Sequence, residues 1–353
     1  MTTYLSPSTD DRRMWDLWLT GMYQSTVVAA DDAGIFGALA LAPATISSLA
    51  GRLDFDVRAT GILLRLLAAI GLVVSRDEVF QLTDQARLYL VKSSPFYWGH
   101  MFRVGVNEGH RATLVRKLAQ KGSAEGAGPV GTAGVGEAMG PAAAWAAGKV
   151  PIEQARVIAA GMHSHSVPAA IGAAGNYEFA GVQRILDVGG GSGCFMVAMA
   201  QRHLALRATV MDLDTMCELA KGYIEAGGVG DRVATLAVDM FRDAWPKGHD
   251  AVFFSNIWHD WNFRTCAWLA EQAYRILPDG GRIMLHEMLL DDNGTGPATA
   301  AAFSLLMLLN TQGQQFTFNE LKTILEGAGF KDISAVYTAG YYSIVTGYKG
   351  DRG

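Results

Sequence analysis

A glycine-rich run near the middle of the chain has the composition of a cofactor-binding loop. An apolar segment ending in Leu186-Asp187-Val188 continues directly into Gly189-Gly190-Gly191-Ser192-Gly193, and a helix is expected to begin near Cys194. Gly189 and Gly191 permit a tight turn and allow a ligand to approach the backbone closely. Cys194 stands at the last position of the dinucleotide fingerprint G-x-G-x-x-G/A, which weakens a dinucleotide reading and leaves other nucleotide-like cofactors open.

Two acidic residues at the ends of later strands extend this candidate site. Asp212 lies about twenty residues beyond the loop, where a carboxylate can accept hydrogen bonds from ribose hydroxyls. Asp239 ends the next expected strand, and Met240 and Phe241 follow it with soft and aromatic side chains suited to an adenine. The alternative is that both carboxylates only cap helices. Both carboxylates are expected at strand ends on the same edge of the sheet as the glycine loop, which favours a role in cofactor binding.

A histidine after the fourth expected strand is a candidate general base. His259 lies within the segment Ser255-Asn256-Ile257-Trp258-His259-Asp260-Trp261. A neutral imidazole can take up a proton near physiological pH, although a single histidine can also be purely structural. Glu287 ends the next strand, and adjacent parallel strands would bring its carboxylate close to the ring. The carboxylate would then orient the imidazole and stabilise its protonated form.

These residues require a parallel sheet to bring them together. From about Gly175 the pattern alternates between strand and helix, which indicates a doubly wound, mostly parallel Rossmann-like α/β sheet with ligands at the carboxyl ends of its strands. The last two strands are expected to form an antiparallel pair. The expected strands are Arg184–Val188, Ala208–Asp212, Val233–Val238, Ala251–Ser255, Arg282–Glu287, Ile333–Tyr337 and Tyr342–Gly347.

The first part of the chain reads mostly as helix and predicts a separate, winged-helix-like domain. Thr45 and Asp56 are expected helix caps, and a short hairpin is expected around Arg76-Asp77-Glu78. We place the helical domain at residues 1–172 and the cofactor-binding domain at 173–353. The glycine- and alanine-rich segment 121–150 reads as a surface segment or lid, and its role stays open.

Composition excludes several classes of function. The 353 residues suit two domains, and a net charge of −5 argues against a nucleic-acid binder. The expected helix Val57–Ile70 offers only Arg58 and Arg65 for DNA, which disfavours a winged-helix regulator. No apolar run is long enough to span a membrane. The three cysteines match no zinc-binding pattern, and their odd number indicates a reducing, cytoplasmic compartment. A metal site formed by His163, His165 and His286 is disfavoured, so no metal site is predicted.

The motifs in their order along the chain resemble those of the plant caffeate-type and bacterial small-molecule O-methyltransferase family. Each motif is modest alone, but the ordered set is specific and spans nearly the whole chain. The set consists of Leu186 to Gly193, Asp212-Leu213, Asp239-Met240-Phe241, His259-Asp260-Trp261, Glu287 and Gly327-Ala328-Gly329-Phe330.

This resemblance implies a cofactor, a partner and a set of site residues. It implies S-adenosylmethionine as the methyl donor, a homodimer built by the N-terminal domain, and a small hydroxylated aromatic or polyketide-like acceptor whose proton His259 removes. The cofactor would be held by Gly189, Gly191, Asp212, Leu213, Asp239, Met240, Phe241 and Ser255. The acceptor pocket would be lined by Asn107, Met162, His165, Trp258, Leu306 and Asn310.

Two departures from the family pattern concern this site. A second acidic partner of the base is replaced by Gln315, which can form hydrogen bonds but carries no charge. The usual lysine near the cofactor is replaced by Ser255. The resemblance therefore also leaves open carbon or nitrogen methylation, or hydroxylase, decarboxylase or pericyclase chemistry on the same scaffold.

Overall fold

The computed structural model describes residues 8–94, 97–103, 108–120 and 152–350 and divides the chain into two compact units. The sheet unit comprises Met1–Arg12, Gly128–Leu289 and Phe318–Gly353, and the helical unit comprises Arg13–Ala127 and Leu290–Thr317. This division differs from the expected boundary after residue 172. Helix α10 (Ile152–Asn176) belongs to the sheet unit because it packs against the helix after the glycine loop, and α14 (Ala298–Asn310) belongs to the helical unit.

The sheet unit contains the expected mostly parallel sheet. Seven strands lie in the order β5-β4-β3-β6-β7-β9-β8, and only the pairs that involve β9 are antiparallel. All seven predicted strands form, including the antiparallel pair at the end. Their bounds are β3 Arg184–Val188, β4 Arg207–Asp212, β5 Val233–Ala237, β6 Ala251–Ser255, β7 Arg282–Met288, β8 Phe330–Ala339 and β9 Tyr342–Lys349.

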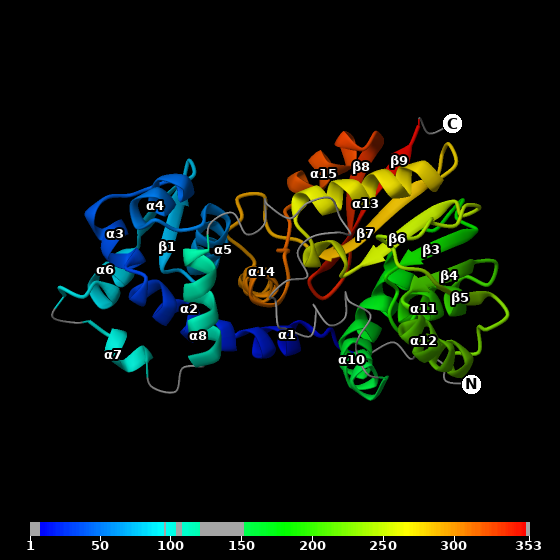
Figure 1. Cartoon of the computed structure of the whole chain (residues 1–353), viewed down its shortest axis with the longest axis horizontal. Helices are drawn as coiled ribbons and strands as arrows, with labels where there is room; N and C mark the ends of the chain where they lie inside the picture. The colour runs from blue at the N-terminus through cyan, green and yellow to red at the C-terminus, as the bar shows by residue number, and fades with distance from the viewer. Residues whose placement is uncertain (1–7, 95–96, 104–107, 121–151, 351–353) are drawn as a thin grey trace. The chain divides into compact units, whose positions relative to one another are not determined.

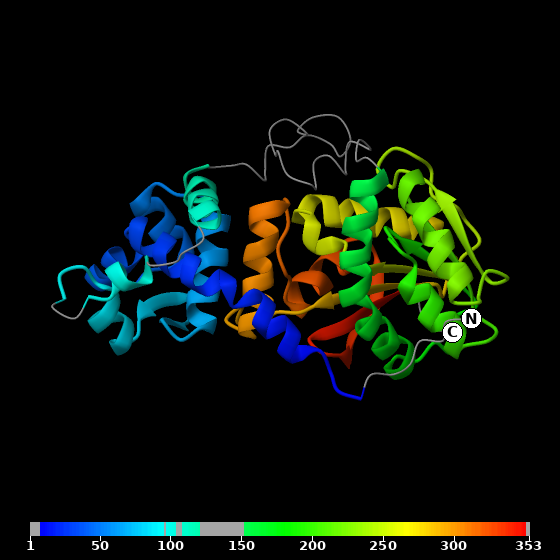
Figure 2. The same cartoon turned by 90° about the horizontal axis from the view of Figure 1, so that it is seen from below.

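Helices cover both faces of this sheet, as in a doubly wound fold. Figure 1 shows α10, α11 and α12 on one face and α13 and α15 on the other, and Figure 2 shows the first group again from below. Because the strand order reverses between β3 and β6, these two strands flank the switch point where such sheets bind ligands. The remaining helices of this unit are α11 Cys194–Arg202, α12 Asp214–Ala226, η1 Trp258–Asp260, α13 Phe263–Ile276 and α15 Phe318–Gly327.

The helical unit has the predicted winged-helix outline. Thr45 Oγ1 accepts the Ser48 N–H and Asp56 Oδ1 accepts the Ala59 N–H, so both predicted caps are confirmed. Its elements are α1 Arg12–Leu19, α2 Gly21–Asp32, α3 Ile35–Leu41, α4 Ile46–Leu53, α5 Val57–Ala69, β1 Val73–Arg76, β2 Val79–Leu82, α6 Asp84–Leu90, α7 Gly99–Phe102 and α8 Glu108–Ala119.

The apolar helix α14 completes the core of the helical unit. It is rich in alanine and leucine on every side, and most of its residues are buried against α5, α8 and α2. The Trp15 ring packs on Phe303 of this helix at 5.2 Å between centroids. A segment far along the chain therefore supplies part of the N-terminal core.

Neither a membrane-spanning helix nor a cluster of metal-ligating side chains is found among the described residues. No helix in the described part of the chain is both long and apolar enough to cross a membrane. Among the same residues, no group of three or more histidines, cysteines or acidic residues is arranged to hold a metal ion. Cys194, Cys217 and Cys266 are buried as free thiols.

Candidate active site

The glycine loop turns sharply between β3 and α11, and glycine is required at each bend. Gly189, Gly191 and Gly193 have φ values of +69°, +57° and +72°, which side chains other than glycine rarely adopt. A Cβ at Gly189 would come within 2.5 Å of Ile257 Cδ1, whereas a Cβ at Gly191 would meet nothing closer than 4.0 Å. The loop is therefore packed closely at its start and open in its middle, where a ligand can approach.

Asp212 joins the second strand to this loop. Its Oδ2 accepts the Gly191 N–H at 2.9 Å and its Oδ1 accepts the Leu213 N–H at 2.7 Å. Burial raises the pKa of Asp212 to about 6, although both backbone hydrogen bonds oppose the shift. Helix α12 has no side-chain cap, so Asp212 does not fill the alternative role of a helix cap. The structure thus brings Gly191, Asp212 and Leu213 together as the sequence predicts.

Asp187 lies buried below the loop as a second carboxylate. It is 1% exposed, and burial together with the charge of Asp212 raises the pKa of Asp187 to about 8. A Cβ on Gly190 would collide with its Oδ2, which explains glycine at this position. Burial beside the Asp212 carboxylate therefore favours the neutral form of Asp187.

Asp239, Met240 and Phe241 follow β5 as expected. Asp239 Oδ1 accepts the Phe241 N–H at 2.9 Å, and the Met240 carbonyl accepts the indole N–H of Trp245 at 2.8 Å. The Phe241 ring packs edge-on against Trp261 at 4.7 Å between centroids. The turn is held by its own hydrogen bonds and presents a carboxylate and aromatic surface after the strand.

His259 and Glu287 form a buried pair, as the strand order predicts. The turn η1 places His259 Nδ1 3.0 Å from Glu287 Oε2, and the other carboxylate oxygen accepts the Trp258 N–H at 3.1 Å. The two residues are 4% and 1% exposed. Burial lowers the pKa of His259, but the charge and hydrogen bond of Glu287 outweigh it and raise this pKa above its ordinary value. The imidazole is therefore held in one orientation, and its affinity for a proton is increased.

The predicted acceptor residues are divided between the two units. Met162 on α10 is 46% exposed, and Trp258 is fully buried against Phe254; both residues belong to the sheet unit.

Gln315 belongs to the helical unit, where it is buried and its backbone N–H donates to Ser304 Oγ. Leu306 and Asn310 lie on α14 in that unit, whereas Asn107 and the His165 side chain lie outside the described residues. The roles of all six acceptor residues and of Gln315 stay predictions.

Two histidines contact the site although the sequence assigned them no role there. His163 Nδ1 on α10 lies 2.8 Å from Ser192 Oγ in the glycine loop, and its ring stacks on Tyr223 at 4.1 Å. Burial lowers the pKa of His163, which favours a neutral ring. His286 Nδ1 lies 3.0 Å from Ser255 Oγ. The register of β6 and β7 could have revealed the contact of His286 with Ser255. No local pattern in the sequence signals the contact of His163 with Ser192.

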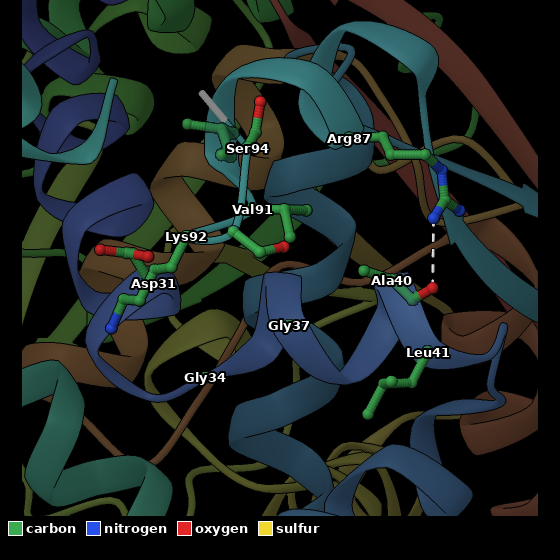
Figure 3. Close-up of a pocket in the computed structure, with 11 residues that line it drawn as sticks. Asp31, Gly34, Gly37, Ala40, Leu41, Arg87, Val91, Lys92 and Ser94 are labelled. Atoms are coloured by element: carbon green, nitrogen blue, oxygen red, sulfur yellow. Dashed lines mark hydrogen bonds between the residues drawn. The ribbon is translucent and has the colours of Figure 1, made fainter. Parts of the chain in front are cut away.

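The helical unit contains a separate hollow of about 620 Å³ (Figure 3). It lies beside α3 and α6, where Arg87 donates a hydrogen bond to the Ala40 carbonyl at 3.1 Å. None of the predicted cofactor or catalytic residues lines it. It is therefore distinct from the site built by the sheet. Its lining residues are Asp31, Gly34, Gly37, Ala40, Leu41, Arg87, Leu90, Val91, Lys92, Ser93 and Ser94.

Comparison with known sequences gives matches over most of the chain. Residues 15–92 match the O-methyltransferase dimerisation domain, and residues 132–331 match the O-methyltransferase domain. The chain is 33% identical over 336 residues to 3-hydroxy-5-methyl-1-naphthoate 3-O-methyltransferase of Streptomyces sahachiroi, which covers 94% of this chain and 93% of that protein. It is 35% identical over 165 residues to the acetylserotonin O-methyltransferase of Bos taurus, 47% of each chain.

Comparison with solved structures gives the same fold. An O-methyltransferase family 2 protein from Planctomyces limnophilus, in complex with apigenin, matches 99% of this chain and all of its own with a TM-score of 0.85 and 26% identity. Human N-acetylserotonin methyltransferase, in complex with S-adenosylmethionine, matches 98% of this chain and all of its own with a TM-score of 0.58 and 22% identity.

Proposed function

The chain belongs to the S-adenosylmethionine-dependent O-methyltransferase family with a dimerisation domain, and on that premise we propose that it methylates a hydroxyl group of a small aromatic metabolite with His259 as general base. The observation that carries the role of His259 is its buried pairing with Glu287 at the carboxyl edge of the sheet. The same edge carries the glycine loop and Asp212.

The residues around the loop fit S-adenosylmethionine, which supplies an activated methyl group on a sulfonium ion. The open middle of the loop at Gly191 leaves room for the ligand, and Asp212 and Asp239 offer carboxylate oxygens to hydroxyl and amino groups. Cys194 stands where the dinucleotide fingerprint has glycine or alanine, which disfavours a dinucleotide. Carboxylates are also compatible with a cofactor that carries positive charge. We infer that these residues hold the cofactor.

His259 is suited to remove the proton of an acceptor hydroxyl. Its Nδ1–H donates to Glu287, which fixes the tautomer and makes Nε2 the basic nitrogen. A phenol has a pKa of about 10, so a base is needed to make its oxygen a good nucleophile at neutral pH. Glu287 then stabilises the imidazolium that forms when the proton is taken up.

The names of the relatives support an aromatic acceptor with a ring hydroxyl. The Streptomyces relative acts on a hydroxynaphthoate, and the Planctomyces structure contains apigenin. Both compounds are hydroxylated fused-ring aromatics. We therefore propose a fused-ring hydroxyaromatic as the acceptor class for this chain.

Incubation with methyl-labelled S-adenosylmethionine and a panel of hydroxynaphthoates, flavones and hydroxyindoles tests this proposal. We expect one labelled methyl group on an acceptor oxygen, located by NMR, and an equal amount of S-adenosylhomocysteine. Acceptors whose hydroxyl is already methylated serve as controls and should remain unlabelled. A label found on carbon or nitrogen, or conversion of an acceptor without S-adenosylhomocysteine, would contradict the proposed function.

We also propose that the chain forms a homodimer through its helical unit. The dimerisation match covers residues 15–92, and several large apolar side chains in that range are exposed in the single chain, Leu41 at 88% and Trp18 at 54%. Leu41 borders the hollow in Figure 3. Large apolar side chains that stay exposed in the single chain are candidates for a surface that a partner covers.

Substitution of Leu41 by Glu is expected to weaken this dimer at least about tenfold, because a charge would be buried in the interface. Sedimentation equilibrium gives the dissociation constant of the dimer. The matched control is Leu204→Glu, since Leu204 is 77% exposed but lies in the sheet unit. A monomeric wild-type chain, or equal effects of the two variants, would refute the proposed interface.

A further inference from the structure

Ser255 and His286 lie side by side at the carboxyl edge of the sheet. They are paired in the register of the parallel strands β6 and β7, and Ser255 Oγ lies 3.0 Å from His286 Nδ1. Strand β6 flanks the switch point next to β3. Ile257, two residues beyond Ser255, lies against the glycine loop, since a Cβ at Gly189 would come within 2.5 Å of its Cδ1. Ser255 therefore stands beside the cofactor loop.

The second hydrogen bond of His286 defines where its proton lies. The Thr338 hydroxyl donates to the Tyr342 carbonyl oxygen at 3.1 Å, so a lone pair of Thr338 Oγ1 is available to His286 Nε2 at 3.4 Å. Nε2 then carries the proton, and Nδ1 is the acceptor. The Ser255 hydroxyl consequently donates to Nδ1, and its oxygen keeps lone pairs for a donor group of a ligand.

Burial keeps this histidine in one protonation state. The His286 side chain is 0% exposed and stacks on the Tyr342 ring at 4.7 Å between centroids and 7° between planes. Burial lowers the pKa of His286 to about 3, so the ring is neutral at physiological pH. The next residue along β7, Glu287, faces the other side of the sheet toward His259. His286 is therefore separate from the catalytic pair.

We propose that His286 is a positioning residue that holds the Ser255 hydroxyl as a hydrogen-bond acceptor for a donor group of the bound cofactor. Ser255 is half-buried, whereas His286, Thr338 and Tyr342 are buried, so this relay of side chains reaches the carboxyl edge of the sheet at the serine oxygen. The hydroxyl and amino groups of S-adenosylmethionine are donors of the required kind. The inference depends on the cofactor and is independent of the proposed acceptor.

Titration calorimetry with S-adenosylhomocysteine and the full chain tests this relay. Ser255→Ala is expected to raise the Kd about three- to tenfold, which is the effect of losing one hydrogen bond. His286→Phe keeps a ring to stack on Tyr342 but removes both nitrogens, and we expect a similar rise. The double variant should bind no more weakly than Ser255→Ala alone, because His286 acts through the serine. An unchanged Kd in Ser255→Ala overturns the proposal. The proposal is also overturned if His286→Phe raises the Kd by the same factor in the Ser255→Ala background as in the wild type.

A second pair of variants covers the case in which His286→Phe does not fold. Thr338→Val removes the acceptor of Nε2–H, which allows the proton to move to Nδ1 and turns the ring from acceptor to donor toward Ser255. We expect the Kd for S-adenosylhomocysteine to rise about three- to tenfold. The control is Thr346→Val, which breaks a buried 2.8 Å bond to the Tyr177 hydroxyl away from the relay.

Equal changes in Kd from Thr338→Val and Thr346→Val would show that the relay has no specific role and would overturn the proposal. A comparison of adenosine with S-adenosylhomocysteine identifies the donor. If Ser255→Ala binds both adenosine and S-adenosylhomocysteine more weakly, the donor lies on the nucleoside. If it binds only S-adenosylhomocysteine more weakly, the donor lies on the amino acid part. Either result supports the relay. Because these titrations contain no methyl acceptor, their failure leaves the proposed hydroxyl methylation untouched.

Discussion

Substitution of His259 by Gln is expected to lower kcat by about 10²- to 10⁴-fold, which is the range that a positioned general base contributes. The glutamine side chain retains hydrogen-bonding capacity but does not take up a proton at neutral pH. The Kd for S-adenosylhomocysteine should stay within about twofold, because His259 contacts Glu287 rather than the glycine loop. Stopped assays for kcat and calorimetry for the Kd separate the two effects.

His249→Gln is the matched control for this experiment. His249 is a half-buried histidine that contacts Thr209 Oγ1 at 3.0 Å, and it lies before β6 at the opposite edge of the sheet. Its replacement should leave kcat within about twofold of the wild type, as expected for distant and independent sites. A His259→Gln enzyme with near wild-type kcat would remove His259 from the mechanism, whatever its affinity for the cofactor.

Most of the sheet could be predicted from the sequence because its strands are buried and are bounded by glycine or polar residues. β3 and β6 occur with the predicted bounds, since each is a short apolar run that ends where glycine or polar residues begin. The pairing of His259 with Glu287 also followed, because Glu287 lies near the end of β7 and His259 is in the turn that follows the neighbouring parallel strand β6. The sequence pattern was therefore enough to predict those contacts that depend only on which strands are neighbours in the sheet.

The remaining features depend on tertiary packing that leaves no local signal. Helix α14 is apolar on every side, so its pattern does not reveal that its partner is α5 in the helical unit. The contact between His163 and Ser192 joins residues 29 positions apart on elements that share no hydrogen-bonded register. Gln315 was predicted beside the base from a resemblance, and its buried position in the helical unit leaves that role a prediction.

Glu287→Gln is expected to reduce kcat by about 10²- to 10⁴-fold while His259 remains in place. An amide can keep its oxygen on the Trp258 N–H, which the carboxylate now accepts at 3.1 Å, and its NH₂ group would then face His259 Nδ1. Nδ1 would become the acceptor, and Nε2 would carry the proton that a base must lack. The amide also gives no charge to stabilise the imidazolium.

The pH profile of this variant gives an independent test of the same pair. As the proposed general base, His259 would act in its neutral form, so we expect the wild-type rate to rise with pH through its pKa, which Glu287 raises above the ordinary value. Loss of the carboxylate leaves two effects on the pKa of His259: burial, which lowers it, and the smaller effect of the Asp260 charge, which raises it. Because burial is the larger effect, the acidic limb of kcat against pH should move to lower pH. The double variant with His259→Gln should be no slower than the slower single variant, because paired residues are not additive. An acidic limb that does not move would mean that another group titrates there, and an additive double variant would mean that Glu287 acts independently of His259.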